Sequence, residues 1–177
     1  MSKCLVAYYS WSGKTAKFAK ALATMLSADL EEIKDVKRRS GVLGYMRSAF
    51  EASKKTSALI EPPTKTLKDY DIIVLGCPVW AGNMASPMRS FILRERHNIK
   101  QLALFCTLGG AGGEATLESM AALSGKTPVA SLQMRDAELA AGSWRGKIGL
   151  FAGAIRGRLS QPLELSTGAN QSMLQNP

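Results

Sequence analysis

Cysteine, histidine and long apolar runs are all scarce in this sequence of 177 residues. Its three cysteines, Cys4, Cys77 and Cys106, show no CxxC spacing, which excludes a disulfide scaffold and indicates buried free thiols. The single histidine, His97, leaves few ligands for zinc, so we expect no metal site. No apolar run reaches the roughly 18 residues of a membrane-spanning helix. The first residues lead directly into a short apolar run, which predicts a first strand rather than a signal peptide, and hence a cytoplasmic protein.

The composition is that of one globular domain. Hydrophobic residues make up 46% of the chain and charged residues 21%, which is enough to bury a single core. The net charge is +9, from 23 basic and 14 acidic residues. Charge of this sign favours acidic or phosphate-bearing partners and says nothing about the fold.

Short apolar runs alternate with helical patterns along the chain. Such runs are typical of strands that are buried on both faces of a parallel sheet. Strands that alternate with helices predict an α/β domain whose sheet is covered on both sides. The expected strands are residues 4–9, 30–36 (the weakest of the five), 72–77, 102–107 and 129–132.

Three unusual loops follow the first, third and fourth expected strands, at residues 10–15, 78–84 and 108–113. In open α/β sheets, ligands bind beyond the carboxyl ends of the strands. The first loop precedes a helix N-terminus, where free backbone N–H groups favour an anion such as a phosphate monoester. An ordinary turn with Ser12 as the helix cap remains an alternative. A nucleotide P-loop is excluded, because Tyr8 stands where that motif needs glycine.

The other two loops add an aromatic side chain and a run of glycines. Trp80 could stack on a planar ring, and its alternative is an ordinary core tryptophan. Residues 109–113 contain four glycines, which let backbone amides approach a ligand closely or simply form a flexible turn. Together the three loops indicate a site for a phosphorylated planar heterocycle.

These three loops, in this order, resemble those of the flavodoxin-like family. The likeness covers residues 3 to about 158 and is greatest to the small FMN-binding flavodoxins and NAD(P)H-dependent oxidoreductases. It implies a flavodoxin-like three-layer α/β/α sandwich, a five-stranded parallel sheet in the order 2-1-3-4-5, and non-covalent FMN. It implies no catalytic side chain, because the cofactor carries the chemistry.

The resemblance also implies the cofactor-binding residues, loop by loop. The first loop would hold the phosphate, the second would border the isoalloxazine ring, and the third would present backbone amides to its pyrimidine edge. The residues are Ser10, Trp11, Ser12, Gly13, Lys14 and Thr15; then Pro78, Val79, Trp80, Ala81 and Gly82; then Leu108, Gly109, Gly110 and Gly113.

Two features depart from an electron-carrier flavodoxin. Carriers are acidic, whereas this chain is basic, and its third loop lacks an aromatic residue that could cover the flavin. Positive charge would stabilise a reduced, anionic cofactor. We therefore expect an FMN-dependent oxidoreductase that passes electrons from NAD(P)H to a quinone or another small acceptor. The alternatives are a carrier reduced by a partner protein and a flavin-free binding module.

The remaining expectations concern domains and partners. Residues 1–159 form the domain, with a basic helical insert at about 37–66, and residues 160–177 form a flexible tail. The insert could be a solvated face, a docking surface for an acidic redox protein, or an attractor for the phosphates of NAD(P)H. Nucleic acid is not favoured, and contact with a membrane surface ranks last. We expect a monomer or homodimer. We expect the glycines spaced four apart in the last helix to pack closely against the sheet or a neighbouring helix, and a dimer contact is the alternative.

Overall fold

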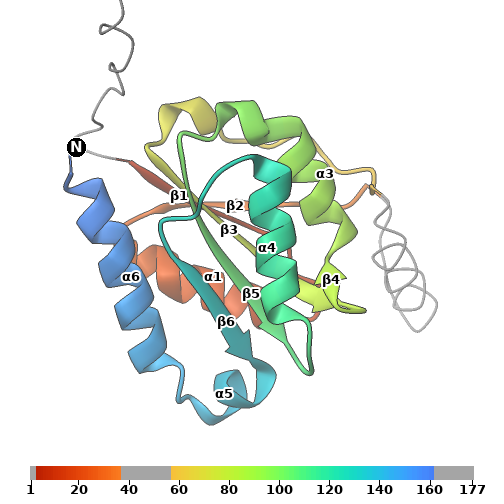
Figure 1. Cartoon of the computed structure of the whole chain (residues 1–177), viewed down its shortest axis with the longest axis vertical. Coiled ribbons are helices and arrows are strands. Elements are labelled where there is room, and N and C mark those ends of the chain that lie inside the picture. The colour runs from red at the N-terminus through yellow and green to blue at the C-terminus, as the bar shows by residue number, and fades with distance from the viewer. Residues whose placement is uncertain (1–2, 37–56, 162–177) are drawn as a thin grey trace, which may run out of the picture.

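The computed structural model describes residues 3–36 and 57–161 and has one sheet between two helical layers (Figure 1). Five parallel strands form the sheet, and a short strand, β4 (Asn83–Met84), pairs antiparallel with the end of the third. With β4 set aside, the parallel strands stand in the expected order 2-1-3-4-5, so the fold class is confirmed. They are, across the sheet, β2 (Asp29–Glu32), β1 (Cys4–Tyr8), β3 (Ile72–Trp80), β5 (Gln101–Leu108) and β6 (Ser131–Arg135).

Helices cover both faces of the sheet, and each face buries its own apolar cluster. On one face, Phe18 and Phe105 lie with their ring centroids 4.9 Å apart; on the other, Met88 and Phe91 are buried. The first face carries α1 (Lys14–Leu26) and α6 (Arg145–Leu159), and the second carries α3 (Ser86–Glu95) and α4 (Gly113–Ser124) (Figure 1). The short helices are α5 (Asp136–Ala141), η1 (Leu67–Asp69) and η2 (Arg96–Asn98).

Strand β3 differs from the prediction that it would end at Pro78. It continues to Trp80, and Pro78 pairs in register with Thr107 of β5. The other neighbour, β1, pairs with β3 only as far as Gly76. In the described sheet Pro78 pairs with β5 alone, because β1 has ended and β4 pairs only with Val79 and Trp80, so proline is tolerated although it lacks an N–H group.

The expected helix of the basic insert lies outside the described residues, as does most of the expected flexible tail; both remain predictions. On either side of residues 37–56 the chain is held to the domain. Asp35 and Ile60 form an antiparallel bridge. The backbone N–H and the hydroxyl of Thr64 both donate to the carboxylate of Glu31, at 2.8 and 2.6 Å.

The glycines of α6 do not pack as expected. Gly149, Gly153 and Gly157 are exposed, and a Cβ atom at each would meet no described atom within 4 Å. The helix instead packs through Ile148, Phe151, Ala152 and Ile155. The prediction that these glycines pack closely against the sheet or a neighbouring helix is therefore wrong for the described residues. No helix among the described residues is both long enough and apolar enough to cross a membrane.

Candidate functional site

The three loops meet at one edge of the sheet because β1, β3 and β5 are parallel and in register. Tyr8 pairs with Gly76, and Gly76 pairs with Phe105, so all three strands deliver their next residues to the same edge. This is the edge at which α/β proteins bind ligands. The sequence prediction that these loops come together is confirmed by the geometry.

The first loop ends at a helix N-terminus whose cap residue has no side chain that could accept a hydrogen bond. Gly13 has φ +84° and is followed directly by α1, so Gly13 rather than Ser12 occupies the cap position. The Oγ atom of Ser10 accepts a hydrogen bond from the N–H group of Ala16 at 3.1 Å. The earliest N–H groups of a helix have no intrahelical acceptor, and here those that precede Ala16 remain available for an anion.

Thr15 is more deeply buried than a side chain that binds a phosphate at the protein surface would be. It is buried, and its hydroxyl lies 2.7 Å from the hydroxyl of Thr107, near the end of β5. The Thr15 side chain therefore joins the first loop to the strand that leads into the third. Its contribution to an anion site comes from its place in the first turn of α1 rather than from an exposed hydroxyl.

The second loop is a tight hairpin between β3 and β4. Ala81 and Gly82 form its turn with φ +47° and +73°, and the side-chain amide of Asn83 donates to the carbonyl of Ala81 at 3.1 Å. Two successive residues with positive φ are typical of the turns that join antiparallel strands. Pro78 and Val79 are half-buried in β3, whereas Ala81 and Gly82 are exposed.

Trp80 is a core tryptophan, which was the alternative to stacking on a ligand. Only 7% of it is exposed, and its ring meets that of Tyr9 edge-on, with centroids 5.5 Å apart. Trp11 of the first loop, by contrast, is 41% exposed. Among the described aromatic residues at this edge, Trp11 is therefore more exposed to solvent than Tyr9 and Trp80.

The third loop packs tightly against the hairpin. A Cβ atom at Gly112, which has φ +92°, would lie 2.6 Å from the Cα atom of Gly82. The hydroxyl of Thr116 in α4 reaches the carbonyl of Gly82 at 3.5 Å. Gly109 and Gly110 are exposed beside this contact, whereas Leu108 and Gly113 are buried. The two loops thus form one continuous wall.

Three residues at this edge were not among the predicted site residues: Thr107, Gly112 and Asp136. Asp136 follows β6 directly, and its Oδ2 atom lies 2.6 Å from the Nζ atom of Lys14. The signal that could have identified it is position, since the fifth strand ends at the same edge as the others. Gly112 lies within the glycine run of residues 109–113, in which the family resemblance assigns cofactor contacts to Gly109, Gly110 and Gly113.

The arrangement fits a phosphorylated planar ligand. The first loop brings together the start of α1, Lys14 and exposed backbone, and it also carries the exposed Trp11. Cβ atoms at Gly13, Gly82 and Gly110 would meet no described atom within 4 Å, so the backbone there is open to a ligand. The donor set and the open backbone match the phosphate and ring of a flavin mononucleotide.

The described residues offer neither a reactive cysteine nor a cluster of metal ligands at this edge. Burial raises the pKa of Cys77 to about 12 and raises that of Cys106 further, so neither forms a reactive thiolate. Burial also raises the pKa of Cys4 to about 12. Within residues 3–36 and 57–161, no three His, Cys, Asp or Glu side chains gather as metal ligands would.

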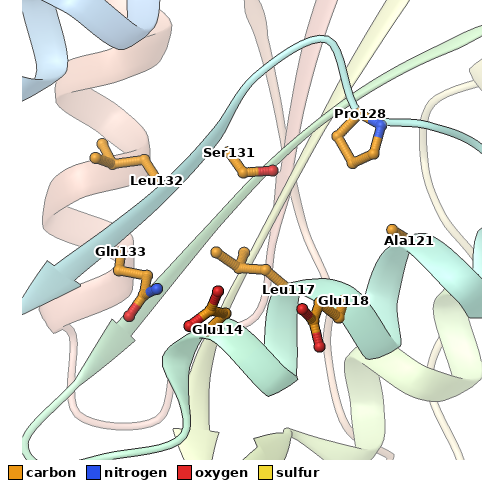
Figure 2. A pocket seen from close by; sticks show the side chains of 8 residues that line it. All are labelled: Glu114, Leu117, Glu118, Ala121, Pro128, Ser131, Leu132 and Gln133. Carbon is orange, nitrogen blue, oxygen red and sulfur yellow. The ribbon is translucent and has the colours of Figure 1, made fainter.

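A groove of about 440 Å³ lies beside the third loop, between α4 and β6 (Figure 2). None of the predicted site residues lines it. It begins next to Gly113, where the Oε1 atom of Gln133 would lie 2.3 Å from an added Cβ atom. Its lining residues are Glu114, Leu117, Glu118, Ala121, Pro128, Ser131, Leu132 and Gln133.

The chain matches both a known family and curated proteins. The flavodoxin family model matches residues 3–144. An NAD(P)H dehydrogenase (quinone) of Chromohalobacter salexigens is 34% identical over 131 residues, which are 68% of this chain and 65% of that protein. The chain thus spans slightly under two thirds of this relative's length.

Solved structures share the fold. A flavoprotein of Lactobacillus acidophilus, crystallised in complex with FMN, is 25% identical with a TM-score of 0.67, over 81% of this chain and 99% of that one. Oxidised flavodoxin 1 of Bacillus cereus is 21% identical with a TM-score of 0.56, over 90% and 100% of the two chains. The second likeness concerns the fold alone.

Proposed function

The chain belongs to the flavodoxin family, and from that premise we propose that it binds FMN and acts as an oxidoreductase between NAD(P)H and a quinone or similar small acceptor. The observation that carries the proposal is the meeting of the three loops at one sheet edge. Contacts between Thr15 and Thr107 and between Gly82 and Gly112 hold these loops together.

Each loop would have its own part in holding the cofactor. The start of α1, with Gly13 and Lys14, supplies donors and positive charge for the phosphate. The exposed backbone of Ala81, Gly82, Gly109 and Gly110 borders the space for the ring, and Trp11 offers an aromatic surface. Bound FMN would supply the capacity to accept and release electrons, and the protein positions it and tunes its surroundings.

Two observations support a reductase rather than a carrier. One curated relative is an NAD(P)H dehydrogenase (quinone), although the chain spans only 65% of its length. The indole of Trp80 is withdrawn into the core, and residues 109–113 contain no aromatic side chain. One side of the bound ring would thus remain accessible to a planar nicotinamide or quinone.

The test is steady-state oxidation of NADH and NADPH by the FMN-loaded protein, with and without a soluble benzoquinone. We expect quinone-dependent oxidation of at least one nicotinamide, and none by the protein without FMN. Tight FMN binding without oxidation of either nicotinamide would contradict the reductase proposal and favour a carrier reduced by a partner protein.

A further inference from the structure

Lys14 and Asp136 form an ion pair across the site edge. Lys14 is the first residue of α1 and Asp136 is the first residue of α5, 122 positions later, yet Nζ and Oδ2 lie 2.6 Å apart. The side chains are 52% and 31% exposed, so both can be reached from solvent. The pair ties the end of β6 to the loop that would hold the phosphate.

The electrostatics of α1 explain why a carboxylate is drawn to this place. A helix N-terminus carries partial positive charge, so a lysine in the first position is unfavourable there. The first turn of α1 contains no acidic residue that could offset it. Asp136 supplies, from another element, the negative charge that this N-terminus lacks.

Asp136 also borders the third loop. Its Oδ2 atom would lie 3.3 Å from a Cβ atom at Gly109. The carboxylate therefore lies between Lys14 of the first loop and Gly109 of the third. A phosphate at the start of α1 would meet a lysine that already has an anionic partner, and that partner would repel it.

We propose that Asp136 competes with the cofactor's phosphate for Lys14, so that phosphate binding releases the Lys14–Asp136 ion pair. This inference rests on the proposed FMN function and deepens it. Asp136 thereby lowers the affinity for the phosphorylated flavin and leaves the affinity for unphosphorylated riboflavin unchanged. Because both side chains are partly exposed, the effect weakens as salt screens it.

The experiment compares wild-type protein with Asp136→Asn by titrating FMN and riboflavin and following flavin fluorescence. We expect Asp136→Asn to bind FMN about threefold to tenfold more tightly at low salt, with a smaller gain at about 0.5 M salt. Riboflavin affinity should not change. The matched control is Glu138→Gln, which removes the same charge two residues away, where the carboxylate pairs with Lys147. The control should change FMN affinity by no more than about twofold.

A double variant distinguishes competition for Lys14 from general electrostatic repulsion between the phosphate and Asp136. In a Lys14→Met background the Asp136→Asn substitution should give a clearly smaller gain. Urea unfolding checks that each variant is folded, and Asp136→Ser is the second variant if the asparagine form is unstable. Unchanged or weaker FMN binding by a folded Asp136 variant would overturn the inference, as would an equal gain for riboflavin.

Failure of the proposed function gives a different result. If folded wild-type protein binds no FMN, the function proposal falls, and inorganic phosphate, followed by ³¹P NMR, becomes the probe. Tighter phosphate binding by Asp136→Asn would then still support the competition for Lys14. Equal phosphate binding by wild type and variant would overturn it.

Discussion

The hydroxyls of Thr15 and Thr107 lie 2.7 Å apart in the buried layer beneath the site. One belongs to the first turn of α1 and the other to the end of β5, so this contact fixes the first loop relative to the third. Each hydroxyl serves as the other's partner in a place that solvent does not reach. This one contact thus fixes the relative position of the two loops and gives each buried hydroxyl its hydrogen-bond partner.

Removing one hydroxyl should therefore cost both stability and cofactor affinity. We expect Thr107→Val to lower the free energy of unfolding by about 1–3 kcal/mol, because the Thr15 hydroxyl stays buried without a partner. FMN affinity should fall as the first loop loses its support. Urea unfolding and FMN titration measure the two effects. The control is Thr24→Val on the exposed face of α1, and equal losses in both variants would contradict the account.

The contact between Gly112 and Gly82 predicts that the third loop accepts no side chain at position 112. Gly112→Ala should lower the free energy of unfolding by about 1–3 kcal/mol, because φ is +92° and the new Cβ atom would meet Gly82. It should also weaken FMN binding by moving the loops apart. Gly110→Ala is the matched control, since a Cβ atom there meets no described atom within 4 Å. If Gly110→Ala proves as damaging to stability, the steric explanation fails.

Arg89 is a buried cation on α3 whose charge should reduce stability. It is 9% exposed, burial lowers its pKa, and its Nη2 atom has no hydrogen-bond partner among the described residues. We expect Arg89→Met to raise the free energy of unfolding by about 1–3 kcal/mol, because a buried charge with an unsatisfied N–H group is costly. The control is Arg94→Met on the same helix, where Arg94 is exposed and donates to the carbonyl of Glu61. Destabilisation by Arg89→Met would show that this guanidinium has a stabilising partner in solution.

The buried thiols predict a loss of stability at alkaline pH. Burial raises the pKa of Cys4 and Cys77 from 9.0 to about 12, so the unfolded chain releases these protons at lower pH than the native protein does. Below pH 9 both thiols make their full contribution to the free energy of unfolding. As the pH rises from 9 towards 12, the free energy of unfolding falls by about 1.4 kcal/mol per pH unit for each thiol.

Urea unfolding between pH 8 and about 10.5 tests this dependence. Cys77→Ala should show a shallower decline in the free energy of unfolding than the wild type. Native protein should also react slowly with a thiol reagent at pH 8, and all three thiols should react after unfolding. Rapid reaction of the folded protein would contradict the burial of these side chains.

The sequence predicted the features that depend on local pattern. Continuous apolar runs such as residues 72–77 and 102–107 are dictated by burial on both faces, and they became the central strands β3 and β5. Because parallel strands end at a common edge, the three loops could be brought together without knowledge of any contact. The helix after the first loop followed from its 3.6-residue spacing.

Features that depend on tertiary pairing could not be predicted in this way. The path of β3 through Pro78 requires knowing that β1 has already ended. The burial of Trp80 against Tyr9 depends on the hairpin with β4, which is two residues long and too short to leave a pattern. The pairing of Lys14 with Asp136 spans 122 residues, and no spacing rule connects them.

The most direct test of the central claim is the visible absorption spectrum of the purified protein after incubation with FMN and desalting, before and after anaerobic NADH or NADPH. The account predicts flavin absorption bands that remain with the protein and are bleached by at least one nicotinamide. Absence of flavin bands from folded protein would contradict FMN binding at the three loops, and bands that neither nicotinamide bleaches would contradict the reductase function.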